Sequence, residues 1–282
     1  MSSISRKTSF RVVAAAVVAA AATLLAACAP SATNADPASL QTLTAGKLTI
    51  GTGSPAYSPW VIEDKPESGK GFESAVAYAV AAKLGFKKSD IVWVRTTFDE
   101  AIAPGPKTFD FNLQQYSITT ERQASVDFSS PYYETTQTVI TAKGSKASSA
   151  KSISDLKGLL IGAATGTTSF QAIGDVIKPT QAALAFNSND DAKAALANGQ
   201  VDAIVVDLPT AIYLTQVEIE GGLIVGQLPT AATGDKFGLV LDKDSALTKA
   251  VTKAVDELRA DGTLAALEAK WLTTSAGAPV LK

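Results

Sequence analysis

The chain contains 282 residues, with 25 basic and 27 acidic side chains, no histidine and one cysteine. One cysteine excludes a disulfide within the chain, and the lack of histidine excludes a Ser-His-Asp triad, a His-Glu-x-x-His zinc site and a haem bound through histidine. The net charge of −2 gives no general basic surface for nucleic acid, and the hydrophobic content of 46% indicates a globular chain.

The first 27 residues have the pattern of a secretory signal. Three basic residues precede an uncharged stretch at 12–27, which is short for a membrane span of about 20 residues. The stretch ends in Leu-Ala-Ala-Cys, which resembles the lipobox of bacterial lipoproteins. This resemblance implies a lipid on Cys28 and cleavage before it. An ordinary secretory signal or an uncleaved anchor is the alternative.

Cleavage at this point would leave 255 residues with a net charge of −5, because the signal carries three positive charges and no negative one. Residues 28–39 are small or polar and contain proline, which predicts a flexible tether between the lipid and the fold. The signal, the lipidated cysteine and the tether together predict an extracytoplasmic protein that is anchored to the cell membrane.

The rest of the chain alternates predicted strands and helices. The segment at 48–52 is a moderately apolar strand, and 71–85 is a helix with one apolar face and Glu73 in its first turn. The segment at 201–206 is a strongly apolar strand. Further strands are expected at 91–94, 109–115, 138–141, 159–163, 182–186, 223–227 and 237–241, and further helices at 168–177, 190–197, 209–217, 245–260 and 263–272.

Strands and helices that alternate at this spacing predict an α/β protein with parallel sheets covered on both faces. The number of expected strands, about ten, exceeds what one compact α/β unit of ordinary size needs. The pattern therefore favours two lobes.

Three local patterns occur in an order that is typical of one protein family. They are Tyr-Ser-Pro-Trp at 57–60 with Gly-Phe-Glu at 71–73, Ser-Ile-Thr-Thr-Glu-Arg at 117–122 with Val-Asp-Phe-Ser-Ser-Pro-Tyr-Tyr at 126–133, and Gly-Thr-Thr-Ser at 166–169 with Asp-Ala-Ile-Val-Val-Asp at 202–207. Asp-Gly-Thr at 261–263 and Lys-Trp at 270–271 follow. Together they resemble the bacterial extracellular solute-binding proteins of polar amino-acid ABC importers (family 3), in their lipoprotein form.

The resemblance implies a periplasmic-binding-protein-like type II fold. In this fold two α/β lobes, each a mostly parallel sheet flanked by helices, are joined by two crossovers and clamp the ligand between them. One lobe would contain residues 40–138 and 236–282, and the other would contain 143–232. The crossovers, which would act as the hinge, would lie near 139–142 and 233–236.

A free amino acid presents a carboxylate and an ammonium group, so its site needs a cation and an anion that are shielded from water. Arg122 offers paired donors that match a carboxylate, and the resemblance assigns it to the ligand carboxylate with Ser117 as a hydroxyl donor. Thr167 and Thr168 follow a glycine at an expected helix start, where free N–H groups favour an anion. A surface arginine, a strand-end serine and a plain helix start are the alternatives.

Asp207 follows the apolar strand at 201–206. A carboxylate at the C-terminal end of a parallel strand faces the cleft in which such sheets bind ligands. The resemblance assigns Asp207 to the ligand ammonium; the alternative is an N-cap of the next helix, and both roles can hold together. The resemblance also places Tyr57 and Phe98 beside the ligand side chain, whereas Trp60 is expected in the core.

Departures from the family pattern bear on the ligand side chain. Ser54 stands where members that bind cationic side chains commonly have an acid. Gln114 and Gln115 make the stretch before Tyr116 more polar than is usual. Their amides either contact a polar ligand side chain or bond to the neighbouring backbone. The departures favour a neutral or polar amino acid.

The expected function is the capture of a free amino acid by a monomeric, lipid-anchored protein and its delivery to an ABC permease and ATPase. No catalytic residue, cofactor, metal site or nucleic-acid partner is expected. Two alternatives stay open. One is a dehydratase-like enzyme on the same scaffold, for which the sequence offers no second acid or base beside Asp207. The other is an amino-acid sensor lipoprotein that works independently of transport.

Overall fold

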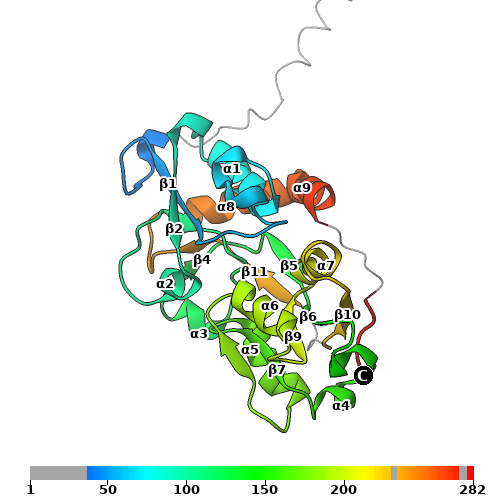
Figure 1. Cartoon of the computed structure of the whole chain (residues 1–282). Helices are drawn as coiled ribbons and strands as arrows, with labels where there is room; N and C mark the ends of the chain where they lie inside the picture. Colours follow the sequence, from blue (N-terminus) through cyan, green and yellow to red (C-terminus); the bar gives the residue numbers. More distant parts are fainter. Residues whose placement is uncertain (1–36, 230–233, 273–277) are drawn as a thin grey trace, which may run out of the picture. The chain divides into compact units, whose positions relative to one another are not determined.

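The computed structural model describes residues 37–229, 234–272 and 278–282, which belong to one compact unit, Ala35–Lys282 (Figure 1). The expected signal peptide, Cys28 and most of the expected tether lie outside the described residues. None of the helices in the described ranges is long and apolar enough to cross a membrane.

Two five-stranded sheets form the framework of this unit. The first has the order β2 (Ile91–Thr96), β1 (Leu48–Gly53), β3 (Phe111–Asn112), β12 (Val240–Leu241) and β4 (Asp127–Phe128). The second has the order β10 (Gly222–Gln227), β6 (Gln137–Ala142), β9 (Ala203–Asp207), β7 (Ile161–Ala164) and β8 (Leu184–Phe186). In the first sheet β1 pairs parallel with β2 and β3, and β12 pairs antiparallel with β3 and β4. In the second sheet β7 pairs parallel with β8 and β9, and β6 pairs antiparallel with β9 and β10.

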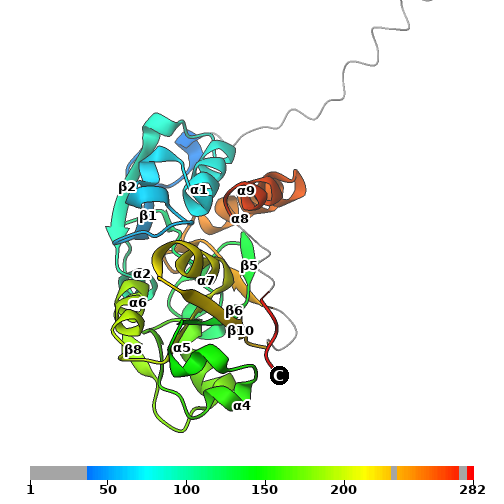
Figure 2. The same cartoon turned by 45° about the vertical axis from the view of Figure 1, so that its right-hand side comes forward.

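Helices flank both sheets. The segments of the first sheet carry α1 (Phe72–Lys83), α2 (Phe98–Ile102), α3 (Thr120–Gln123), α8 (Thr248–Ala260) and α9 (Thr263–Trp271). Those of the second carry α4 (Ile153–Leu156), α5 (Thr168–Ala172), α6 (Asn189–Ala197) and α7 (Leu208–Tyr213). Figures 1 and 2 both show α1, α8 and α9 packed together, away from α4 and α5. We call the first sheet with its helices the first lobe, and the second sheet with its helices the second lobe.

The core of the first lobe explains why α1 follows a glycine. Gly71 has a φ of 101°, and a Cβ atom there would lie 2.4 Å from the backbone oxygen of Trp60. Only glycine tolerates both conditions without strain. The close approach allows Trp60 and Phe72, which are 1% and 0% exposed, to pack edge to face in the core. The expectation that Trp60 belongs to the core is confirmed.

The second sheet is apolar on both faces. In β9, Ala203 and Val205 belong to one hydrophobic cluster, whereas Ile204 and Val206 belong to another on the opposite face. Successive side chains of a strand point to opposite faces, so a continuous apolar run indicates a strand with both faces covered. The strongly apolar stretch before Asp207 therefore becomes a buried strand that delivers this carboxylate to the edge of the sheet.

Two paired strands run between the lobes. The strand β5 (Tyr133–Thr135) precedes β6, and the strand β11 (Asp235–Phe237) precedes β12. The strands β5 and β11 pair antiparallel with each other. The expectation of a crossover near 139–142 is wrong, because these residues lie inside β6, which pairs with β9 and β10 on its two sides. The first passage between the sheets therefore comes earlier in the chain than expected.

The end of the chain packs on the second lobe. Val280 forms a parallel bridge with Gln227 at the end of β10, and Leu281 is 2% exposed within a core cluster of the second lobe. A Cβ atom on Gly226 would lie 2.7 Å from Leu281, so this glycine makes room for it. The expectation that assigned all of 236–282 to the first lobe is therefore wrong for 278–282. A short apolar tail carries no pattern that distinguishes one sheet from another.

Candidate functional site

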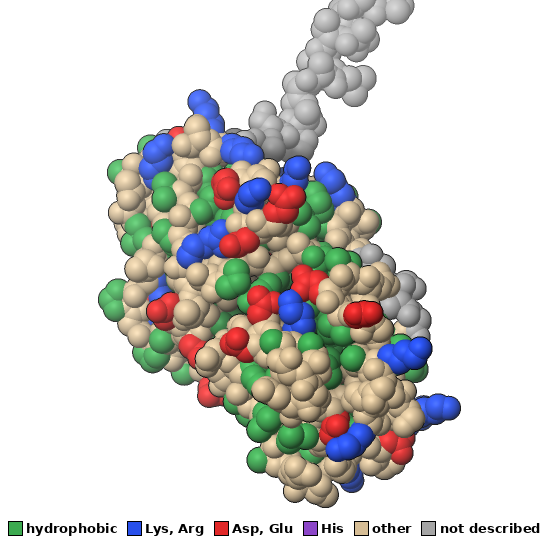
Figure 3. Space-filling view, viewed as in Figure 1, with side chains coloured by type: hydrophobic (Ala, Val, Ile, Leu, Met, Phe, Trp, Pro, Cys, Tyr) green, Lys and Arg blue, Asp and Glu red, His purple; other side chains and the backbone are tan. Residues whose placement is uncertain are grey.

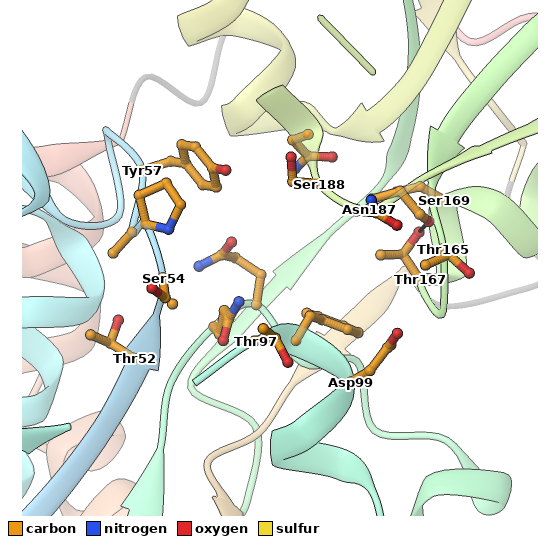
Figure 4. A pocket seen from close by; sticks show the side chains of 18 of the residues that line it. Thr52, Ser54, Tyr57, Thr97, Asp99, Thr165, Thr167, Ser169, Asn187 and Ser188 are labelled. Atoms are coloured by element: carbon orange, nitrogen blue, oxygen red, sulfur yellow. Dashed lines mark hydrogen bonds between the residues drawn. The ribbon is translucent and has the colours of Figure 1, made fainter. Parts of the chain in front are cut away.

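A cavity of about 130 Å³ is lined by residues of both lobes (Figure 4). A cavity of roughly 150 Å³ is large enough for a benzene-sized molecule. Figure 4 shows Thr52, Ser54 and Tyr57 on one side, and Thr165, Thr167, Ser169, Asn187 and Ser188 on the other. Figure 3 shows acidic and basic side chains interspersed over the visible face of the molecule. The cavity is thus lined by both lobes, and many of its lining residues are polar.

Arg122 is the cation of this cavity lining. It belongs to α3, which Thr119 caps by accepting a hydrogen bond from the Arg122 N–H at 3.2 Å. The guanidinium is nearly buried, with the residue 8% exposed, and donates from Nη1 to the Ser117 carbonyl at 2.7 Å and from Nη2 to the Gly166 carbonyl at 2.8 Å. Burial lowers the pKa of Arg122, which stays a cation at neutral pH.

The contacts of Arg122 leave part of its donor capacity for a ligand. Guanidinium carries five N–H groups, and two of them serve the carbonyls of the two lobes. The Phe98 ring lies against one face of the group, 5.2 Å from ring centroid to Cζ. The side chain is therefore fixed in place, with donors available at the cavity.

Asp207 ends β9 and also lines the cavity. Its side chain makes no capping bond to α7 and instead accepts a hydrogen bond from Gln137 Nε2 at 2.9 Å. The sequence left two roles open for Asp207, a contact with the ligand ammonium and an N-cap of the next helix. The structure shows no N-cap bond from its side chain. Burial and the nearby charge of Asp235 raise the pKa of Asp207 to about 8, although Gln137 and Arg122 act in the opposite direction.

The other residues expected at the ligand carboxylate have different surroundings. Thr167 and Thr168 line the cavity, and Thr167 caps α5 through a bond from Phe170 N at 3.1 Å. The hydroxyl of Thr168 donates to Asp235. Ser117 is not among the lining residues, and its hydroxyl lies 3.1 Å from both Thr168 Oγ1 and Asp235 Oδ2. Ser117 is therefore behind the cavity wall.

All five residues expected at the ligand side chain line the cavity: Tyr57, Phe98, Ser54, Gln114 and Gln115. Gln114 Oε1 accepts from the Tyr116 hydroxyl at 2.8 Å, and Gln114 Nε2 makes no hydrogen bond within the described residues. The backbone N–H and the side-chain amide of Gln115 both donate to Glu73, so this amide is not bonded to its neighbouring backbone.

Glu73 is a cavity residue that the sequence did not single out. It starts α1, is 2% exposed, and accepts hydrogen bonds from Gln115 and from the Tyr132 hydroxyl. Burial raises the pKa of Glu73 to about 7. The sequence places Glu73 in the first turn of an expected helix and in the Gly-Phe-Glu pattern at 71–73, and neither observation gives it a role at a cavity.

The strand expected at 109–115 covers only Phe111–Asn112. Gln115 has a φ of 53°, so it is not part of an extended strand.

The lobes also touch beside the cavity. Trp60 Nε1 donates to Thr210 Oγ1 at 2.9 Å, from the core of the first lobe to α7 of the second. Within the described residues, no group of three or more acidic, histidine or cysteine side chains is placed to hold a metal ion.

Known proteins give an independent comparison. Residues 48–274 match the model of the bacterial extracellular solute-binding proteins, family 3. A probable histidine-binding protein of Campylobacter jejuni is 32% identical over 76% of this chain and 80% of its own length. An L-arginine-binding protein of Pseudomonas aeruginosa is 30% identical over 83% of this chain and 92% of its own.

Solved structures agree with this match. An ancestral arginine-binding protein, determined bound to arginine and also bound to glutamine, is 33% identical with a TM-score of 0.68, over 81% of this chain and 98–99% of its own length. The expected two-lobed periplasmic-binding-protein fold is thereby confirmed, and these relatives are named as binding proteins rather than enzymes. The chain belongs to family 3 of the bacterial extracellular solute-binding proteins.

Proposed function

We propose that this protein binds a free amino acid in the cavity between the lobes and delivers it to an ABC permease and its ATPase. One observation carries the proposal: the cation Arg122 and the half-buried carboxyl group of Asp207 line the same small cavity. The free donors of Arg122, with the turn at Thr167 and Thr168, bind the ligand carboxylate, and Asp207 binds the ammonium. Ser117 supports this site through Thr168.

The ligand side chain points toward Tyr57, Phe98, Ser54, Gln114 and Gln115. The Nε2 group of Gln114, which makes no hydrogen bond within the described residues, supports the expected preference for a neutral or polar side chain. The carboxylates of Glu73 and Asp99, which also line the cavity, support a second candidate, a basic side chain. An acidic side chain is disfavoured in either case, because it would meet carboxylates.

Ligand binding stabilises contact between the lobes. The bond from Arg122 to Gly166 and the bond from Trp60 to Thr210 both join the first lobe to the second. Because β5 and β11 connect the lobes side by side, bending near them, including the expected second crossover at 233–236, opens and closes the cavity. The permease recognises the closed monomer. A lipid on Cys28, after removal of residues 1–27, keeps the protein at the membrane, with 28–39 as the tether.

A panel of the twenty amino acids tests this function by thermal unfolding and calorimetric titration. A ligand present at 100 times its Kd is expected to stabilise the protein by about 2.7 kcal/mol. L-glutamine and L-arginine separate the two side-chain classes, and L-glutamate serves as the acidic control that is expected to be inactive. If no amino acid raises the unfolding temperature or binds in calorimetry, the proposed function is wrong.

A further inference from the structure

The side-chain amide of one glutamine donates hydrogen bonds to two carboxyl groups, of which one lines the cavity and one does not. Gln137 begins β6 and is 5% exposed. Its Nε2 donates to Asp207 Oδ1 at 2.9 Å and to Asp235 Oδ2 at 2.7 Å, which a side-chain amide can do together because it carries two hydrogens. Its Oε1 accepts a hydrogen bond from Ser169 Oγ at 2.6 Å. This bond fixes the amide with its N–H groups toward the carboxylates.

Asp235 connects this pair to both lobes. It lies on β11, the strand that leads back to the first lobe, and is not among the residues that line the cavity. The same oxygen that accepts from Gln137 also accepts from Ser117 of the first lobe and from Thr168 of the second. One carboxylate, on a strand between the lobes, thus contacts Ser117 of the first lobe and both Gln137 and Thr168 of the second.

The surroundings of Asp207 contain an excess of negative charge. The charged groups that face it are Asp235 from β11, Glu73 from α1 and Arg122 from α3, and the neutral amide of Gln137 faces it from β6. The phenols of Tyr132 and Tyr133 are also near enough to sense its charge. Arg122 is the cation among these groups, and the ligand carboxylate would share it. A ligand ammonium would supply the missing positive charge.

We propose that Asp235 is a positioning residue of the ammonium subsite, which orients Asp207 through Gln137 and makes the subsite select a protonated amine by the charge of two carboxylates. The inference rests on the proposed function and adds a residue that does not touch the ligand. Because Asp235 also bonds to Ser117 and Thr168, the hydrogen bonds at the ammonium subsite and the contact between the lobes form one network.

The test compares Asp235→Asn with the matched control Glu134→Gln. Glu134 lies on the neighbouring strand β5, and its side chain is 55% exposed and paired with Lys236, so the control removes a charge away from the cavity. The association constants of L-glutamine and L-arginine are measured by calorimetry between pH 5.5 and 9. For the wild-type chain and the control, binding is expected to strengthen with pH and to level off above 8, as Asp207 passes its pKa and loses its proton.

Ligand binding by Asp235→Asn is expected to level off about one pH unit lower than in the wild-type chain, because this variant lacks the like charge that raises the pKa of Asp207. A lost hydrogen bond alone would weaken binding equally at every pH. A profile that coincides with that of Glu134→Gln overturns the proposal.

A ligand-free measurement separates this proposal from the proposed function. The carboxyl carbon of Asp207 is titrated by NMR in the empty wild-type chain, in Asp235→Asn and in Glu134→Gln. A lower midpoint in Asp235→Asn alone supports the proposal. An equal midpoint in all three overturns it, whatever the amino-acid panel shows. If neither amino acid binds while the midpoint shifts, the function fails and the coupling between the two carboxylates stands.

Discussion

Replacing Arg122 with alanine is expected to weaken amino-acid binding by about 30-fold or more, because truncating one partner of a buried charge pair costs roughly 2–5 kcal/mol. The side chain is the cation of the cavity lining, and the ligand carboxylate would lose its paired donors. Calorimetry with the amino acid that the panel identifies measures the loss.

Arg122 also joins the lobes through Ser117 and Gly166, so part of the loss in Arg122→Ala is structural. Arg122→Lys separates the two contributions. It keeps the charge but not the planar fork, and its binding is expected to lie between wild type and alanine. Arg259→Ala, at an exposed position of α8, is the matched control and should bind normally. Normal binding by Arg122→Ala would remove Arg122 from the site.

The second large effect is expected for Asp207→Asn, which should reduce binding by about 100-fold or more because the ammonium loses its counter-charge. Asparagine still offers an oxygen to Gln137 Nε2, so the local hydrogen bond can persist. The pH dependence of binding should disappear as well, since it arises from the ionisation of Asp207, whose pKa is about 8. Asp175→Asn, at an exposed position, is the control.

Asp207→Asn should raise the stability of the ligand-free protein, although it weakens ligand binding. The pKa of Asp207 is about 8 in the folded chain and near 3.8 when unfolded, so the folded state binds more protons between these values. Stability contributed by the protonated group is therefore lost as the pH rises through this window. Asp207→Asn removes that loss, and the empty variant is expected to be more stable than wild type at pH 8 by thermal unfolding. A variant that is less stable than wild type at pH 8, or that binds normally, would contradict the assignment.

Local patterns of the sequence placed Arg122 and Asp207 next to recognisable elements, and the family resemblance implied their roles. Asp207 follows an apolar run that favours a buried strand, and Arg122 lies in a helical turn that Thr119 caps. The chemistry of a guanidinium and a carboxylate then limits what each can bind. Both expected residues line the cavity.

Glu73, Gln137 and Asp235 could not be predicted in the same way. Their partners are 31 to 118 residues away in the sequence, and only folding brings them together. Ser117 shows the same limit in reverse. The family resemblance suggested a cavity residue, whereas its hydroxyl bonds to Asp235 and Ser117 is not among the residues that line the cavity. A strand was expected at 138–141 and a crossover near 139–142. No local signal indicated that residues 137–142 pair with β9 and β10, so that the chain passes between the sheets before this strand.

The central claim is that one cavity binds the carboxylate and the ammonium of the same amino acid. Calorimetric titration of the wild-type chain with the free amino acid identified by the panel, its methyl ester and its N-acetyl derivative tests the claim directly. Only the free amino acid is expected to bind, because the ester lacks the charge for Arg122 and the acetylated form lacks the charge for Asp207. Comparable affinity for either blocked form would contradict it.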